Sequence, residues 1–175
     1  GRQMDGLTVG VIGYGRLGSL YANYCLAFGS KVLVYDPYKV VGSDRIEQVK
    51  DVQVLLEGSD VISFHIHVTN ETKNMVDKNW FRKMKTDVLL VNTSRGDILV
   101  EKDLKEFLTG NRNARVATDV LADEIRNRKE SPLLDYAGKS NQIIITPHIG
   151  GMTREAQEIA YNHATDLLKK YFYGK

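Results

Sequence analysis

The sequence has little cysteine, little proline and no long apolar run. Cys25 is the only cysteine in 175 residues, so no disulfide can form within the chain. The amino terminus lacks the basic, apolar and small-residue order of a signal peptide. The longest apolar runs are far shorter than the roughly 20 residues that span a bilayer. We therefore expect a cytoplasmic protein without a membrane segment.

No charge of one sign dominates the chain. The 24 basic and 22 acidic residues give a net charge of +2, and the two signs are interspersed. Nucleic acids and anionic membrane surfaces select a basic patch or stripe, so neither is an expected partner, and small molecules are. At 42% hydrophobic residues the chain can form one packed core, and residues 1–175 are expected to be a single domain.

Short runs of apolar, β-branched residues recur along the chain. They are continuous instead of alternating with polar residues, which is typical of strands that are covered on both faces. We predict strands at 7–13, 31–36, 61–65, 87–92, 115–120 and 142–146.

Helical patterns lie between most of these runs. We predict helices after the first strand, where Leu17, Leu20, Tyr21, Tyr24 and Phe28 share a face, and at 51–57, 78–84, 101–109 and about 153–171. His163 in the last helix is expected to be partly buried and without a function. The polar stretch Ile125 to Asn141 is predicted as a surface excursion. Alternating strands and helices predict an α/β fold, a doubly wound parallel sheet of six or seven strands with helices on both faces.

A glycine-rich loop follows the first predicted strand. "VIGYGRLGS" places Gly13, Gly15 and Gly18 in a G-x-G-x-x-G pattern between a strand and a helix. There Gly13 allows a tight turn, Gly15 lets the backbone approach a pyrophosphate, and Gly18 lets the helix lie close to the strand. The amino end of the helix offers unpaired N–H groups to phosphates. A tight turn without a ligand is the alternative interpretation.

An acidic residue ends the second predicted strand. Asp36 in "VYDPY" stands where a carboxylate can accept hydrogen bonds from the adenosine ribose and repel a 2′-phosphate. This favours NAD over NADP, although the nearby Lys39 could soften the discrimination. The alternative is that Asp36 only starts a turn with Pro37.

A histidine follows the last predicted strand in "TPHIGGM", on a backbone that Gly150 and Gly151 are expected to keep open. The imidazole of His148 can act as an acid or base, as a metal ligand, or as a polar group that caps a loop. Together with His65, His67 and Cys25 it does not show the ligand spacing of a zinc site, so no metal is predicted. The residue types alone leave the other two roles open.

Four segments together resemble the cofactor-binding domain of the D-isomer-specific 2-hydroxyacid dehydrogenases: "TVGVIGYGRLGS", "VYDPY", "NTSRGDILVEKDL" and "TPHIGGMTREAQ". The resemblance covers nearly the whole chain, in order. It implies a Rossmann fold, NAD as cofactor, a small 2-hydroxy acid as substrate and a homodimer formed through this domain. It also implies a substrate-binding domain outside this sequence, so we expect the chain to bind NAD but to turn over little substrate alone.

The resemblance implies three catalytic residues. Arg95 would hold the substrate carboxylate, His148 would exchange the proton, and Glu124 would pair with His148. The residue types suit these roles, because a guanidinium binds a carboxylate through two parallel hydrogen bonds and an imidazole transfers protons near neutral pH. A neighbouring carboxylate favours the charged imidazolium.

The resemblance also implies a set of cofactor-binding residues. Those of the glycine loop would meet the pyrophosphate, and those after later strands would surround the adenine and the nicotinamide. They are Gly13, Gly15, Arg16, Leu17 and Gly18 for the pyrophosphate, Asp36 for the ribose, His65 and Ile66 for the adenine, and Thr93, Ser94 and Asp119 around the nicotinamide, with Arg95, His148 and Gly150 completing the set.

Two positions depart from the family pattern. Ile125 follows Glu124 where the family usually has proline, and His67 stands in "HIH" where the family commonly has His-x-Pro. An NAD-sensing regulatory module, similar to corepressor relatives of the family, is the alternative function. A different NAD enzyme, such as an adenosylhomocysteine hydrolase, is a third possibility, against which "NTSRG" and "TPHIGG" count. The presence of Arg95, Glu124 and His148 favours the dehydrogenase.

Overall fold

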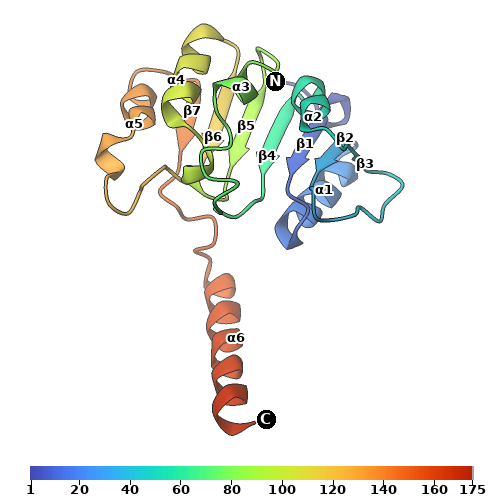
Figure 1. The fold of residues 1–175 in the computed structure, drawn as a ribbon, viewed down its shortest axis with the longest axis vertical. Helices are drawn as coiled ribbons and strands as arrows, with labels where there is room; N and C mark the ends of the chain where they lie inside the picture. Colours follow the sequence, from blue (N-terminus) through green and yellow to red (C-terminus); the bar gives the residue numbers. More distant parts are fainter. Residues whose placement is uncertain (175) are drawn as a thin grey trace.

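The computed structural model describes residues 1–174, which form a parallel β-sheet flanked by helices and one long helix that extends away from it (Figure 1). The sheet has seven strands in the order β3-β2-β1-β4-β5-β6-β7. The predicted doubly wound α/β fold is confirmed. The strands are β1 (Thr8–Ile12), β2 (Lys31–Tyr35), β3 (Glu47–Gln48), β4 (Val61–Phe64), β5 (Leu89–Asn92), β6 (Arg115–Thr118) and β7 (Ile143–Ile145).

The strand order reverses at β1, which lies between β2 and β4. Val9 of β1 is aligned with Val32 on one side and with Val61 on the other. All three side chains are buried, as expected for strands without a polar alternation. The loops that leave β1 and β4 therefore diverge from one point at the carboxyl edge of the sheet, which is where doubly wound sheets bind ligands.

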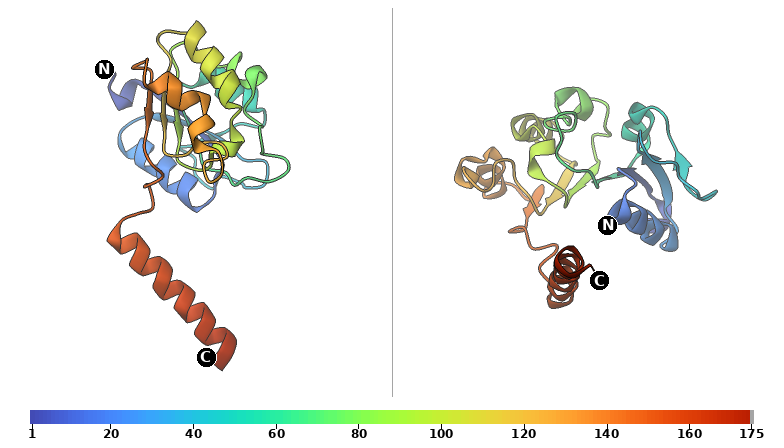
Figure 2. Two further views of the ribbon diagram at one scale, coloured as in Figure 1. Left: turned by 90° about the vertical axis from the view of Figure 1, so that its left-hand side faces the viewer. Right: turned by 60° about the horizontal axis from the view of Figure 1, so that its bottom comes forward.

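Helices cover the two faces of the sheet unevenly (Figure 2). Four helices contribute Leu55, Phe81, Leu104 and Leu133 to one large core cluster, and α1 contributes Ala22 and Cys25 to a smaller cluster with β1 and β2. The four helices are α2 (Val52–Gly58), α3 (Lys78–Phe81), α4 (Glu101–Gly110) and α5 (Pro132–Ala137), and the fifth is α1 (Arg16–Ala27). The edge strand β7 is open on one face, because Ile144 is 67% exposed. The prediction that this strand is covered on both faces is wrong.

The apolar residues whose spacing predicts α1 do not form the face of the helix that is buried against the sheet. The helix turns the small residues Gly18, Ala22 and Cys25 toward the sheet. Larger residues do not fit, because a Cβ atom on Gly18 would lie 2.0 Å from the carbonyl oxygen of Gly13. The outer face therefore carries the exposed side chains of Leu17, Leu20, Tyr24 and Phe28.

The polar stretch from Ile125 to Asn141 is more than a surface excursion, because it contains α5. The Ser131 hydroxyl caps this helix by accepting the N–H of Leu133, and Pro132 occupies its first turn. Leu133 is fully buried in the core. With six residues, the helix is too short for periodicity to reveal it.

Two smaller elements also differ from the predictions. The two-residue edge strand β3 has no apolar pattern and was not predicted. The helix predicted at 78–84 ends at Phe81, and Met84 continues into the core from a turn.

The last helix, α6 (Arg154–Tyr173), points away from the sheet (Figure 1; Figure 2, left). The Thr153 hydroxyl caps its amino end, and Gly174 ends it in a left-handed conformation. None of its residues is buried, so the prediction that His163 is partly buried is wrong. Within residues 1–174 no helix is both long and apolar enough to cross a membrane.

Candidate functional site

The glycine loop lies at the reversal point between β1 and β4. Gly13 has φ of 93°, and a Cβ atom there would lie 2.5 Å from the carbonyl oxygen of His65. Only glycine fits such a turn. By contrast, no atom lies within 4 Å of a Cβ atom built on Gly15. The backbone at Gly15 is thus open to a ligand, and the first helical N–H groups follow directly after it.

Asp36 is fixed by the backbone around it. One carboxylate oxygen accepts the N–H of Tyr14 in the glycine loop at 2.7 Å. The other accepts the N–H groups of Tyr38 and Lys39 at 2.8 and 3.0 Å. Asp36 therefore does start a turn, and the same carboxylate also holds the glycine loop against β2. These bonds leave its remaining lone pairs as acceptors for a ligand.

Two adjacent hollows bring most of the predicted cofactor residues together, and Ile66 lines both. The first has a volume of about 270 Å³ and is lined by Gly15, Arg16, Leu17, His65, Ile66, His67, Thr93, Ser94 and Arg95. The second has a volume of about 380 Å³, lies beside Asp36 and includes Gly13, Tyr38, Glu71, Thr72 and Met75. Sequence reasoning missed the last four, because no motif marks them.

His65 faces inward from this region. Its ring packs on Tyr21 with 5.0 Å between centroids, and its Nε2 atom lies 2.9 Å from the Ser63 hydroxyl. Burial lowers the pKa of His65 from 6.5 to about 4. The imidazole is therefore neutral near pH 7. It supports the floor of the hollow as an uncharged ring.

Arg95 follows β5 at the rim of the first hollow and is exposed. One of its terminal nitrogens donates to the Ser94 carbonyl at 2.6 Å. Within residues 1–174 no acidic side chain forms an ion pair with it. An exposed guanidinium without an ion pair to these residues is available to bind an anionic ligand.

Glu124 and His148 meet although 24 residues separate them. The Nδ1 atom of His148 lies 2.5 Å from the Oε1 atom of Glu124, and the other Glu124 oxygen accepts the N–H of Leu121 at 3.2 Å. The His148 side chain is 47% exposed and that of Glu124 is 23% exposed. This arrangement holds one imidazole nitrogen and leaves Nε2 for another partner. No hydrogen bond or ion pair joins Arg95 to either residue in the described chain.

The backbone of His148 has a positive φ of 57°, whereas Gly150 and Gly151 do not. The positive φ of this loop is therefore at the histidine and not at the two glycines. Instead, a Cβ atom on Gly150 would lie 3.0 Å from the Asp119 carboxylate, so Gly150 allows a close approach. A non-glycine residue with positive φ is strained, and such strain tends to occur at functional sites.

Asp119 holds the loop that carries His148. Its carboxylate accepts the Thr146 hydroxyl at 2.5 Å and the N–H groups of Ile149 and Gly150 at 3.0 and 2.8 Å. The residue is only 6% exposed. Burial acts to raise the pKa of Asp119, but these hydrogen bonds outweigh it and the pKa is lowered. The Asp119 carboxylate thus fixes the loop after β7.

Comparison with known proteins decides the family. The model of the D-isomer specific 2-hydroxyacid dehydrogenase, NAD binding domain, matches residues 1–150. The chain belongs to this family. The predicted resemblance and the predicted cofactor, NAD, are thereby confirmed.

Several D-2-hydroxyacid dehydrogenases are similar to the chain in sequence and structure. The D-3-phosphoglycerate dehydrogenase of Archaeoglobus fulgidus is 40% identical over 161 residues, which are 90% of this chain and 29% of that protein. The hydroxypyruvate reductase of Blautia hydrogenotrophica is 38% identical over 95% of this chain and 52% of its own length. The D-lactate dehydrogenase of Aquifex aeolicus, solved with NAD and lactic acid, is 33% identical, with a TM-score of 0.88 over 99% of this chain and 55% of that chain. The chain thus spans about a third to a half of these relatives.

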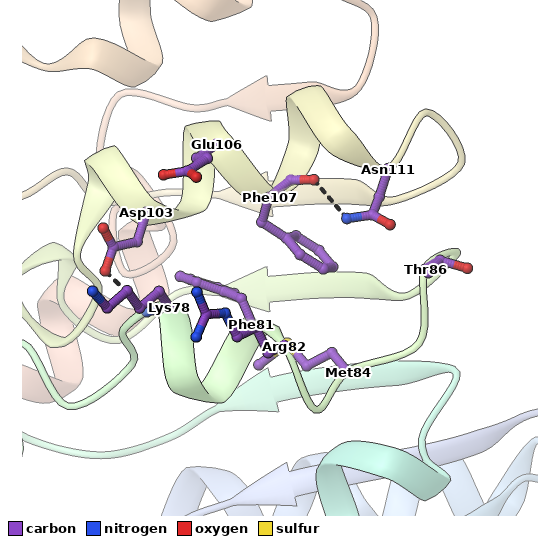
Figure 3. Close-up of a pocket in the computed structure, with 9 residues that line it drawn as sticks. All are labelled: Lys78, Phe81, Arg82, Met84, Thr86, Asp103, Glu106, Phe107 and Asn111. Atoms are coloured by element: carbon purple, nitrogen blue, oxygen red, sulfur yellow. Dashed lines mark hydrogen bonds between the residues drawn. The ribbon is translucent and has the colours of Figure 1, made fainter.

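A further hollow lies on the helical face of this D-2-hydroxyacid dehydrogenase domain, between α3 and α4 (Figure 3). Its volume is about 260 Å³, and it shares no lining residue with the two hollows at the sheet edge. Lys78, Arg82 and Glu106 surround it, while Asp103 accepts the N–H of Lys78. No buried side-chain polar atom of residues 1–174 lacks a hydrogen-bond partner, so nothing unsatisfied points into it. The chemistry-bearing residues lie at the sheet edge instead.

Proposed function

We propose that this domain is the NAD-binding half of a dehydrogenase that transfers a hydride between NAD(H) and a D-2-hydroxy acid or 2-keto acid. The observation that carries the proposal is the pair of Glu124 and His148 at the carboxyl edge of a NAD-binding sheet. The relatives act on different acids, so the proposal names the class of substrate and not one compound.

The cofactor residues are proposed from their placement. Gly15 and the first turn of α1 offer an open backbone for the pyrophosphate, and Asp36 offers a carboxylate for the adenosine ribose. The apolar hollow beside Asp36 suits the adenine, and the hollow that ends at Thr93 and Arg95 leads toward the substrate. When bound, NADH supplies the hydride to the carbonyl carbon of the keto acid.

The protein supplies the proton and the orientation. His148 donates a proton to the carbonyl oxygen of the keto acid, and in the reverse direction it accepts the proton of the hydroxyl group. Glu124 accepts the Nδ1–H group, which leaves the proton for transfer on Nε2 and stabilises the imidazolium. Arg95, without an acidic partner, binds the substrate carboxylate. Asp119 holds the His148 loop by three hydrogen bonds.

Two apolar surfaces support further contacts. The outer face of α1 carries four large exposed side chains, and α6 exposes Ile159, Leu167 and Tyr171. Exposed apolar patches of this kind mark interaction sites. We propose that α1 contributes to a homodimer formed through this domain, and that a substrate-binding domain outside the sequence completes the cleft.

Titration calorimetry of this chain with NADH, and separately with NADPH, tests the cofactor site. We expect saturable binding of NADH and much weaker binding of NADPH, because Asp36 repels a 2′-phosphate. Equal binding of both would contradict the role of Asp36. A panel of 2-keto acids then tests the reaction. High turnover by this chain alone would contradict the need for a second domain.

A further inference from the structure

Glu101, at the start of α4, is a buried carboxylate that anchors the loop of Glu124. The residue is 8% exposed. Its Oε1 atom accepts the N–H of Ala122 at 2.7 Å, and its Oε2 atom accepts the Ser131 hydroxyl at 2.6 Å. Glu124 lies between these two anchor points along the chain. Sequence reasoning missed Glu101, since the first turn of a surface helix commonly carries glutamate.

No cation neutralises Glu101 within residues 1–174. Its carboxylate is instead held by two neutral donors at the amino end of α4. Hydrogen bonds to a buried carboxylate are strong, and removing one leaves a buried charge with an unmade bond. The loop of Glu124 cannot move away from α4 without losing these bonds.

Neighbouring residues of the same segment add to the anchor. Gly96 contacts the loop so closely that a Cβ atom there would lie 1.9 Å from the carbonyl carbon of Leu121. Asp97 accepts the N–H of Asp123 at 3.4 Å. The segment that begins with Arg95 thus holds the loop at several points, and it links the proposed substrate-binding cation to the proposed acid-base pair.

Two consecutive N–H groups connect Glu101 to His148. The N–H of Leu121 donates to Glu124, whose other oxygen binds His148, while the N–H of the next residue, Ala122, donates to Glu101. The position of the Ala122 peptide therefore determines where the Glu124 carboxylate lies. Displacement of this peptide moves Glu124 relative to the imidazole.

We propose that Glu101 is a positioning residue that keeps Glu124 in place to hold the proton of neutral His148 on Nδ1. A role of Glu101 in catalysis rests on the proposed function. The contacts of Glu101, Glu124 and His148 can be tested in the absence of any enzymatic reaction. The direct consequence of the positioning role is a single imidazole tautomer, because the hydrogen bond made by one ring nitrogen sets which nitrogen carries the proton.

The test is ¹⁵N NMR of the His148 ring in this chain, recorded with the imidazole neutral. We expect wild type to show the Nδ1–H tautomer and Glu124→Ala, which has no side-chain hydrogen-bonding group, to show the mixture of an unconstrained imidazole. Glu101→Ala should lose the single tautomer to the extent that Glu124→Ala does. Glu101→Gln should keep it, because the amide can accept from Ala122 and donate to Ser131.

Glu106→Ala is the matched control, since Glu106 is an exposed glutamate on the same helix and should leave the tautomer unchanged. The amide signals of the glycine loop report whether each variant is folded. If Glu101→Ala does not fold, Glu101→Asp decides, because it keeps the charge but withdraws the carboxylate from the Ala122 N–H, and we expect it to weaken the preference for one tautomer. An unchanged tautomer in Glu101→Asp would then overturn the inference.

Two further outcomes separate this inference from the proposed function. A folded Glu101→Ala variant that keeps the Nδ1–H tautomer, while Glu124→Ala loses it, would overturn the role of Glu101 and leave the acid-base pair standing. A wild-type spectrum equal to that of Glu124→Ala would overturn the pair itself, and the positioning role would fall with it.

Discussion

The Oε1 atom of Glu124 lies 2.5 Å from the Nδ1 atom of His148, and each residue lies on a loop that a buried carboxylate holds. Glu101 holds the first loop and Asp119 holds the second. The pair is therefore fixed from both sides before any ligand arrives. Such preorganisation is what acid-base catalysis requires.

Replacement of His148 by glutamine should remove the proposed proton transfer and leave the cofactor site intact. With a substrate-binding domain present, we expect kcat to fall by about 10²- to 10⁴-fold, the usual contribution of a general acid or base. NADH affinity should stay near wild type. His163→Gln, on the exposed face of α6, is the control for loss of a histidine. A variant at position 148 with unchanged kcat would exclude the assigned role.

Asp36→Ala should weaken NADH binding and reduce the preference for NADH over NADPH. We expect the preference to fall by about tenfold, which corresponds to about 1.4 kcal/mol. The physical reason is the loss of both the ribose acceptor and the charge that repels a 2′-phosphate. Asp44→Asn, an exposed acid in the following loop, should change neither affinity. Calorimetric titration of both variants with both cofactors makes the measurement.

The folded protein should lose stability as pH falls, through His65. The pKa of His65 is about 4 in the folded state and near 6.5 when exposed, so below pH 6.5 the unfolded chain binds a proton that the folded chain does not. Its contribution to stability is complete above pH 6.5 and is lost as pH falls toward about 4. The free energy of unfolding, measured with urea for wild type and for His65→Gln between about pH 4 and pH 6.5, tests this pH dependence. Parallel pH profiles of the two proteins would contradict the assignment.

Gly18→Ala should destabilise the domain, because its Cβ atom would lie 2.0 Å from the carbonyl oxygen of Gly13. Forcing extra volume into a tight contact typically costs about 1–3 kcal/mol. Gly42→Ala is the matched control, since nothing lies within 4 Å of a Cβ atom there. Thermal unfolding should therefore show a lower Tm for the first variant only. Equal Tm values would mean that α1 can move away from β1 at little cost.

The apolar face of α1 predicts how copies of the chain associate. Leu20→Glu places a charge among Leu17, Tyr24 and Phe28 and should weaken the proposed dimer by about 1 kcal/mol or more. Asn23→Glu adds the same charge at an exposed polar position of the same helix and should have a small effect. Sedimentation velocity over a range of concentrations measures both. A monomeric wild type would contradict the proposed dimer.

Local sequence signals predicted the sheet and the glycine loop well. All strands except β3 are apolar runs of the right length. Gly18 is required by a contact within one strand–turn–helix unit, whereas Gly13 is required by its positive φ and by the carbonyl of His65, which follows β4. The buried face of α1 could not be predicted in this way. Its largest apolar residues look like core residues, but the close approach of α1 to β1 excludes them.

Contacts between distant segments were the part that the sequence could not provide. Nothing local marks Glu101 as buried or pairs it with Ala122 and Ser131. The positive φ of His148 likewise depends on Asp119, 29 positions earlier, through bonds to the two residues that follow it. The types of residue at the site were predictable, while the contacts that hold them depend on the folded chain.

The separation of α6 from the sheet has a thermodynamic consequence. A helix of 20 residues without a buried side chain receives almost no tertiary stabilisation, so its helix–coil equilibrium is close to that of an isolated peptide. Its amide protons should therefore exchange with solvent far faster than those of β1 and β4. Any surface that covers its apolar side would order the helix as it binds, so docking and helix formation would be a single coupled equilibrium.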